Sequence, residues 1–172
     1  MGLIMERDLS TKAKILACTL AILIPLIVGG VSAFLTSDSM KTFGTMKQPP
    51  LSPPALLFPI VWTLLYAMMG VSNYLIWKEA PTEETLIKAR KKAIILYGIQ
   101  LFLNFCWSPI FFNGKYYYFA FAWLVVLWCL ILWLITVSWK FSKPASCLLI
   151  PYLLWSTFAG YLNIMIAVLN ND

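Results

Sequence analysis

Five long apolar runs alternate with short polar segments and predict five membrane-spanning helices. A helix needs about 20 apolar residues to cross roughly 30 Å of hydrocarbon. The predicted spans cover residues 15–35, 55–77, 93–112, 116–139 and 145–169, and none of them contains Asp, Glu, Lys or Arg. Alternating strand patterns are absent, so the sequence predicts a single-domain, all-α membrane protein, a five-helix bundle rather than a barrel.

The first apolar run has two interpretations. Basic residues precede it and Val31-Ser32-Ala33 resembles a cleavage site, as in a removable signal peptide. Its length of 21 residues and its Gly29-Gly30 pair, which suits close helix packing, favour a retained span.

The composition supports a membrane protein and narrows its chemistry. Hydrophobic residues make up 61% of the chain and charged residues 12%, against about 25% charged in soluble domains. Histidine, the commonest metal ligand and the usual general base, is absent. The four cysteines form no CxxC pair and lie in or beside apolar runs, where thiols behave as small hydrophobes. The sequence therefore predicts no metal, disulfide or cofactor.

The basic residues indicate an orientation. Ten of the 13 lie in the N-terminal tail and in the gaps after the second and fourth runs, and three lie on the other side. The positive-inside rule then places the N-terminus in the cytoplasm of a bacterium, with the outer mitochondrial membrane as the alternative location. The net charge of +6 therefore indicates topology signals and not nucleic-acid binding.

Two polar gaps have more than one interpretation. Residues 36–54 contain KQPPLSPP, with four prolines in eight residues, which predicts a semi-rigid, non-helical segment. This segment is either a lid over one mouth of the bundle or a plain connector. The segment KEAPTEETLIKARKK after the second run is predicted to be a solvated topology signal, with headgroup or partner binding as the alternative.

Three of the runs carry aromatic and amide side chains at helical spacing, in stripes about 80° wide on the first two runs and about 100° wide on the third. The stripes consist of Trp62, Tyr66, Met69, Asn73 and Trp77; of Tyr97, Gln100, Asn104, Trp107 and Phe111; and of Tyr152, Trp155, Ser156, Ala159 and Asn163. Interfacial aromatics and helix-gluing amides are one explanation. An amide facing lipid is costly, so we expect the stripes to face inward, around an aromatic-walled cavity or a tightly packed polar seam.

A cavity of this kind would suit a flat, apolar, aromatic ligand, because indole rings stack on π systems. The absence of charged residues within the spans disfavours ion-coupled transport, which usually places carboxylates or basic groups there.

Three segments, in this order, carry a family resemblance: SPPALLFPIVWTLLYAMMGVSNYLIWKEA, QLFLNFCWSPIFF and PYLLWSTFAGYLN. They resemble the translocator protein family, also called TspO or the peripheral-type benzodiazepine receptor, over roughly residues 43–170. The matching positions are Asn104, Trp107, Phe111, Phe112, Pro151, Tyr152, Trp155, Phe158, Leu162 and Asn163.

The resemblance implies a five-helix bundle, often dimeric, whose ligand pocket is capped by the first loop. Family members bind porphyrins such as protoporphyrin IX, and animal members bind cholesterol and benzodiazepine- or isoquinoline-type drugs. Some bacterial members are reported to degrade protoporphyrin IX in light with two tryptophans, which match Trp62 and Trp155. The ligand-contacting alanine of the fifth helix matches Ala159.

The chain departs from the family pattern in two places. Thr42, Phe43 and Leu51 stand where the first loop usually has a Trp-Tyr pair and a WTPP-like end. The cholesterol motif requires a basic residue after its tyrosine, and none follows Tyr161. Sterol recognition through that motif is not supported.

Four hypotheses follow: a tetrapyrrole-binding or sensor protein, a light- and oxygen-dependent porphyrin-degrading enzyme, a transporter of porphyrin or other apolar metabolites, and a scaffold whose tryptophans only pack. The expected partners are a porphyrin-like ligand, membrane lipid and a second copy of the chain. The predicted ligand-binding residues are Trp62, Tyr66, Asn73, Tyr97, Asn104, Trp107, Tyr152, Trp155, Ala159 and Asn163, with Trp62 and Trp155 as hypothetical catalytic residues.

Overall fold

A computed structural model describes residues 10–170, which form five long helices and no strand within that range. The helices are α1 (Thr11–Phe43), α2 (Leu57–Lys78), α3 (Glu84–Ser108), α4 (Tyr117–Ser138) and α5 (Lys143–Leu169), and a π-helical turn, η1 (Pro109–Asn113), continues α3. All five are long and apolar enough to cross a membrane. The prediction of an all-α, five-span bundle is confirmed.

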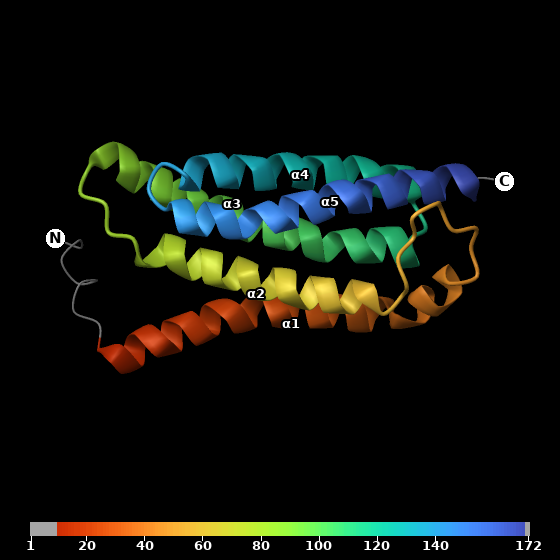
Figure 1. The fold of residues 1–172 in the computed structure, drawn as a ribbon, viewed down its shortest axis with the longest axis horizontal. Helices are drawn as coiled ribbons and strands as arrows, with labels where there is room; N and C mark the ends of the chain where they lie inside the picture. Colours follow the sequence, from red (N-terminus) through yellow and green to blue (C-terminus); the bar gives the residue numbers. More distant parts are fainter. Residues whose placement is uncertain (1–9, 171–172) are drawn as a thin grey trace.

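The helices pack as a closed ring. Helix α1 contacts α2 and α3, α5 contacts α2 and α4, and α3 contacts α4, so the order around the ring is α1, α2, α5, α4, α3. Figure 1 shows α1 and α2 on one side of the bundle and α3, α4 and α5 on the other. A helix forms most of its backbone hydrogen bonds within itself, which a hydrocarbon environment requires. Large apolar side chains such as Ile27 and Phe34 remain exposed on the outer surface of α1, as expected for contact with lipid.

Two glycines bring α1 and α2 close together. A Cβ atom on Gly29 would lie 2.1 Å from the Tyr66 ring, and one on Gly70 would lie 2.5 Å from the Cα of Ile22. Gly30 has nothing within 4 Å of the corresponding position. Only the first member of the Gly-Gly pair therefore serves close packing.

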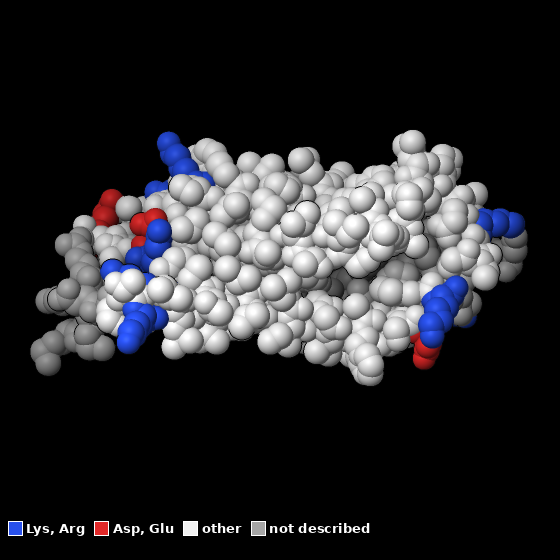
Figure 2. All heavy atoms as spheres, turned by 60° about the horizontal axis from the view of Figure 1, so that its bottom comes forward, with Lys and Arg blue, Asp and Glu red and all other residues white. Residues whose placement is uncertain are grey.

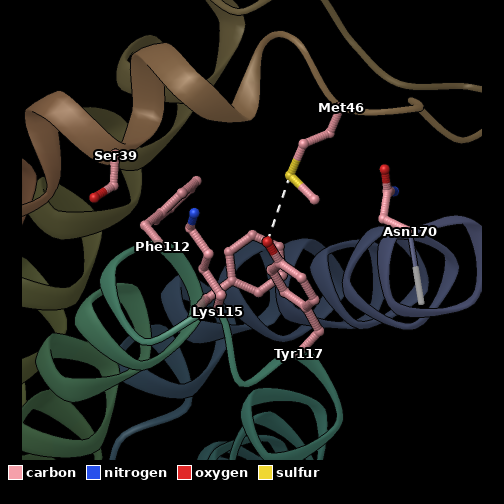
Figure 3. A pocket seen from close by; sticks show the side chains of 7 residues that line it. Ser39, Met46, Phe112, Lys115, Tyr117 and Asn170 are labelled. Carbon is pink, nitrogen blue, oxygen red and sulfur yellow. Dashed lines mark hydrogen bonds between the residues drawn. The ribbon is translucent and has the colours of Figure 1, made fainter. Parts of the chain in front are cut away.

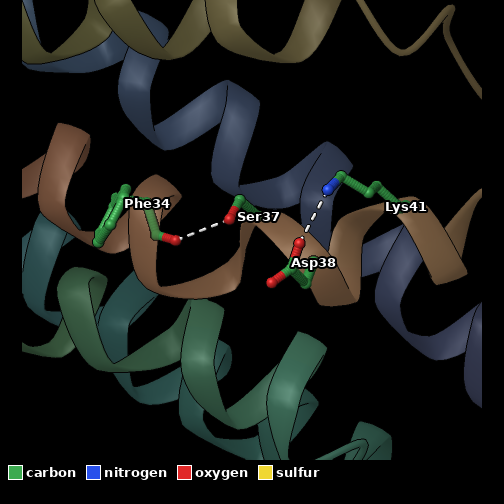
Figure 4. A network of polar contacts seen from close by, with 4 residues as sticks. All are labelled: Phe34, Ser37, Asp38 and Lys41. Carbon is green, nitrogen blue, oxygen red and sulfur yellow. Dashed lines mark hydrogen bonds and ion pairs between the residues drawn. The ribbon is translucent and has the colours of Figure 1, made fainter.

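Helix α1 extends beyond the predicted span, so the expectation that residues 36–54 are non-helical is wrong for residues 36–43. This stretch contains no proline or glycine, and the helix ends directly before Gly44. Ser37 Oγ donates to the Phe34 carbonyl at 2.9 Å, and Lys41 forms an ion pair with Asp38 at 2.8 Å (Figure 4). The non-helical connection to α2 is shorter than expected and covers residues 44–56.

The charged segment after α2 is also largely helical, because α3 begins at Glu84 and not near residue 93. Lys88 forms an ion pair with Glu84 at 2.7 Å on the first turns of α3. Arg90 Nε donates to the Ile76 carbonyl at 3.2 Å, and its Nη2 donates to the Trp77 carbonyl. Arg90 thus satisfies carbonyls at the end of α2 that have no partner within that helix.

Charged side chains gather at the two ends of the molecule and leave an uncharged belt between them (Figure 2). This distribution, together with the five apolar helices, is that of an integral membrane protein. The predicted N-inside orientation stays a prediction. Arg7, one of the basic residues behind it, lies outside the described residues. Figure 2 also shows that the surface is hollowed toward the end of the bundle where the α1–α2 connection lies.

Candidate functional site

The three predicted stripes face the interior of the bundle. The buried members are Tyr66, Met69, Tyr97, Gln100, Asn104, Phe111, Tyr152, Ser156 and Asn163. The half-buried members are Trp62, Asn73, Trp77, Trp107, Trp155 and Ala159. The cost of placing amides against lipid explains this arrangement.

A hydrogen-bonded polar seam occupies the middle of the bundle. Tyr66 Oη donates to Asn104 Oδ1 at 2.6 Å, and Asn104 Nδ2 donates to Tyr152 Oη at 2.9 Å. The seam joins α2, α3 and α5 through three side chains that are all at least nine-tenths buried. At these residues the inward stripes form the tightly packed polar seam, one of the two arrangements expected from the sequence.

An aromatic wall lies beside the seam, between α2 and α5, and consists of Phe58, Trp62, Tyr66, Tyr152, Trp155 and Phe158. Trp62 lies 5.4 Å from Tyr66 and 6.2 Å from Tyr152, measured between ring centroids. Trp155 lies 6.0 Å from Phe58 and 5.5 Å from Phe158. Trp62 thus reaches α5 through Tyr152, and Trp155 reaches α2 through Phe58.

Three stripe residues have buried polar atoms with no hydrogen-bond partner among the described residues. They are the indole Nε1 of Trp155, the hydroxyl of Tyr97 and both amide atoms of Gln100. Burying such groups without a partner costs several kcal/mol in an apolar medium. These atoms can therefore hydrogen-bond to a polar guest within the bundle.

A second polar contact lies nearer the α1–α2 connection. Trp107 Nε1 donates to Asn163 Oδ1 at 3.3 Å, and Asn163 Nδ2 donates to the Tyr117 carbonyl at 2.8 Å. The Trp107 ring stacks on Phe111 with centroids 5.1 Å apart. These contacts join α3, α4 and α5 just below the mouth of the bundle.

The structure forms a pocket of about 270 Å³ at this mouth, shown in Figure 3. We call it the mouth pocket. It draws residues from α1, the α1–α2 connection, η1, the η1–α4 turn, α4 and the end of α5. Its lining residues are Ser39, Met46, Phe111, Phe112, Lys115, Tyr117 and Asn170.

Pro109 explains the local shape of the mouth pocket. It has no N–H to bond the carbonyl four residues earlier, and the Phe105 carbonyl accepts from Ser32 Oγ of α1 at 3.2 Å instead. The backbone then widens into the π-turn, a geometry that is frequent at functional sites. Within this turn the consecutive residues Phe111 and Phe112 both line the pocket.

Side-chain contacts from α4 and α5 hold the α1–α2 connection over the mouth of the bundle. Tyr117 Oη contacts Met46 Sδ at 3.5 Å, and Tyr161 Oη donates to the Pro50 carbonyl at 2.8 Å. Asn170 binds both backbone groups of Lys47, accepting from its N–H at 3.0 Å and donating to its carbonyl at 3.1 Å. Of the two interpretations of this segment, the contacts favour a lid.

Trp77, a stripe residue that was not among the predicted site residues, lies apart from the wall, and some pocket residues were missed. Trp77 stacks on Tyr74 at the charged end of α2, where its carbonyl accepts from Arg90. Sequence reasoning used Lys115 only for topology and did not single out Met46 or Asn170. The Ser-Pro break after α3 was the one local signal for a changed helix geometry there.

The described residues contain no cluster of three or more His, Cys, Asp or Glu side chains that could hold a metal ion. The four cysteines are free thiols. The chemistry available at the wall and the mouth is therefore stacking, hydrogen bonding by amides, hydroxyls and indoles, and one lysine.

Comparisons with known proteins agree with the motif resemblance. Residues 21–169 match the model of the TspO/MBR family. A translocator protein homolog of Schizosaccharomyces pombe is 41% identical over 130 residues, covering 76% of this chain and 78% of its own. The tryptophan-rich protein TspO of Chlorobaculum tepidum is 36% identical over 162 residues, covering 91% and 98%. The translocator protein of Ovis aries is 34% identical over 134 residues, covering 76% and 75%.

Proposed function

Because the chain belongs to the TspO/MBR family, we propose that this membrane protein binds tetrapyrroles of the protoporphyrin IX type at the aromatic wall between α2 and α5. A tetrapyrrole is a flat, largely apolar ring system, and indole and phenol rings stack on such systems. No buried side chain among the described residues is charged, which suits an apolar ligand that enters from the membrane.

The Trp155 indole N–H carries this proposal. It is a buried donor without a partner among the described residues, and its ring lies between Phe58 and Phe158. A ligand that stacks on the wall and accepts this hydrogen bond removes the cost of the unsatisfied donor. Ala159, one turn further along α5, adds little bulk beside Trp155.

Binding at the wall requires a rearrangement. The rings of α2 and α5 already contact one another, and each such contact is worth about 0.5–1.5 kcal/mol beyond area burial. A tetrapyrrole must displace some of these contacts and replace them with its own. Affinity then depends on how easily the two helices separate.

Tryptophan fluorescence in lipid nanodiscs tests the proposal. We expect protoporphyrin IX to quench the wild-type protein saturably. A double substitution of Trp62→Phe and Trp155→Phe should abolish the saturable phase, whereas Trp139→Phe should keep it, because Trp139 is an exposed residue at the end of α4. Linear quenching alike in all three proteins would refute tetrapyrrole binding at the wall.

A second function, light-driven oxidation of the bound porphyrin by oxygen, is supported by the surroundings of Trp62. Its ring contacts Tyr66 and Tyr152, whose hydroxyls are joined through Asn104. An indole that gives an electron to excited porphyrin leaves a porphyrin radical anion, to which oxygen can add. The adduct returns the electron to the indole radical, so the net reaction joins one oxygen molecule to one porphyrin, and a neighbouring tyrosine can hold the radical in the interval. Product analysis after illumination separates this function from binding. Equal porphyrin loss in the wild type and the double variant would exclude a tryptophan-dependent reaction.

A further inference from the structure

We propose that the mouth pocket is a second ligand site, which takes a small aromatic carboxylate. It shares no residue with the aromatic wall. The inference therefore stands independently of tetrapyrrole binding. Three properties of the pocket carry it: its size, its aromatic surface and the set of hydrogen-bond donors that it presents.

The size of the pocket sets an upper limit on the ligand. Its volume of about 270 Å³ lies just below the roughly 300–1,000 Å³ of pockets for drug-sized ligands. A guest of one or two fused rings matches this space, and a whole tetrapyrrole does not. The lid, fastened at Met46, Lys47 and Pro50, closes one side of it.

The floor of the pocket is aromatic and ordered by ring contacts. Phe111 is only 3% exposed and packs edge-to-face against Phe112, with centroids 4.9 Å apart, and against Tyr117, at 5.1 Å. The Met46 thioether lies across from them (Figure 3) and is a favourable neighbour for aromatic rings. These walls favour a flat guest ring over an aliphatic chain.

The polar groups of the pocket are donors that suit an anion. Lys115 extends from the η1–α4 turn toward the side formed by α1 (Figure 3), and it forms no ion pair with any described carboxylate. Ser39 has a hydroxyl with no protein partner among the described residues. Within residues 10–170, the Tyr117 hydroxyl is hydrogen-bonded to the Met46 sulfur, a weak acceptor.

Among the described residues, no acidic side chain lines the pocket to compete for these donors. Asp38, the acidic residue nearest in sequence to Ser39, is exposed and already paired with Lys41. The backbone of Lys115 is left-handed, with φ 54°, which fixes the direction from which its side chain leaves the turn. An aromatic ring against Phe111 would direct its carboxylate toward Lys115.

Calorimetric titration of the full chain in phosphatidylcholine nanodiscs tests the proposal with indole-3-acetate and with 3-methylindole, which has the same ring without the charge. We expect saturable binding of indole-3-acetate that Lys115→Gln weakens roughly ten-fold, the change that one charge-assisted hydrogen bond produces. Lys115→Arg should retain most of the affinity, and 3-methylindole should bind weakly and respond less than two-fold to either change.

Lys41→Gln is the matched control, because Lys41 lies at the same end of the bundle but does not line the pocket. It should leave the affinity for indole-3-acetate unchanged. Three results would overturn the proposal: no saturable binding of indole-3-acetate by folded wild-type protein, equal binding of the charged and neutral probes, or equal losses in Lys115→Gln and Lys41→Gln. The last result would indicate that the affinity depends on the general surface charge and not on the pocket.

Discussion

The middle of the bundle and its mouth are built from similar side chains but packed differently. In the middle, Tyr66, Asn104 and Tyr152 bond one another directly and fill the space between three helices. At the mouth, Tyr117 and Asn170 bond the lid and leave a pocket beneath it. Aromatic and amide composition therefore does not decide whether a region is open.

The backbone makes the difference. In the middle, Gly29 lets α1 approach so closely that its backbone presses on the Tyr66 ring. At the mouth, Pro109 interrupts α3, and the widened π-turn moves the chain away from regular packing. The two regions therefore differ because Gly29 allows close packing in the middle, whereas Pro109 opens space at the mouth.

The largest effect is expected from Gly29→Ala. The added methyl would meet the Tyr66 ring at 2.1 Å, so the ring or α1 must move and the polar seam must shift with it. Overpacking of this kind costs about 1–3 kcal/mol. Gly30→Ala is the matched control, since its methyl meets nothing within 4 Å and alanine is the better helix former. Thermal unfolding in detergent should give a lower melting temperature for Gly29→Ala than for Gly30→Ala. Equal melting temperatures would contradict this prediction.

A somewhat smaller loss is expected from Asn104→Leu, which removes the amide between Tyr66 and Tyr152. Interhelical hydrogen bonds in membranes average about 0.6 kcal/mol each, so losing two should cost about 1 kcal/mol. Asn73→Leu changes a half-buried amide of α2 that makes no such bond among the described residues. It should alter the unfolding free energy by less than about 0.5 kcal/mol. Similar losses in the two variants would mean that the seam adds nothing specific.

At the mouth, Asn170→Ala should act locally. It removes both bonds to the Lys47 backbone and should raise the rate of trypsin cleavage after Lys47 about five-fold, as expected for about 1 kcal/mol of lost loop stability. Cleavage after Lys78, at the opposite end of the bundle, serves as the internal control. Unchanged cleavage after Lys47 would show that the lid does not depend on Asn170.

The smallest effect is expected from Leu51→Asn. The Ser52 N–H donates to the Pro49 carbonyl at 3.2 Å, and Leu51 occupies the third position of this turn with φ 67°. Left-handed backbone costs about 1–2 kcal/mol for most residues and less for asparagine. The variant should slow cleavage after Lys47 about two-fold. Leu56→Asn, which alters an exposed leucine with an ordinary φ of −64°, should give no protection.

The sequence predicted the middle of the molecule better than the mouth. The five helices and their inward faces follow from span length and from the cost of amides in lipid, and both are local properties of a run of residues. Tyr66, Asn104 and Tyr152 were each identified as inward-facing for that reason. Whether they enclosed space or filled it depended on Gly29 of another helix, which periodicity does not reveal.

No periodic pattern in the sequence identified the residues of the mouth pocket. The mouth pocket combines single residues from α1, the lid, η1, α4 and α5, and only tertiary packing brings them together. Residues 36–43 are polar and were expected in a loop, yet without proline or glycine they continue α1 and bring Ser39 to the pocket. Lys115, used only as a topology signal, is the one basic residue among the described residues that line it.

Arg90 joins the ends of two consecutive helices independently of the chain between them. Its guanidinium belongs to α3 and donates to two carbonyls in the last turn of α2, so a side-chain contact holds these ends together in addition to residues 79–83. The α2–α3 connection is therefore the natural place to insert an epitope, or to split the gene into two separately expressed fragments that reassemble.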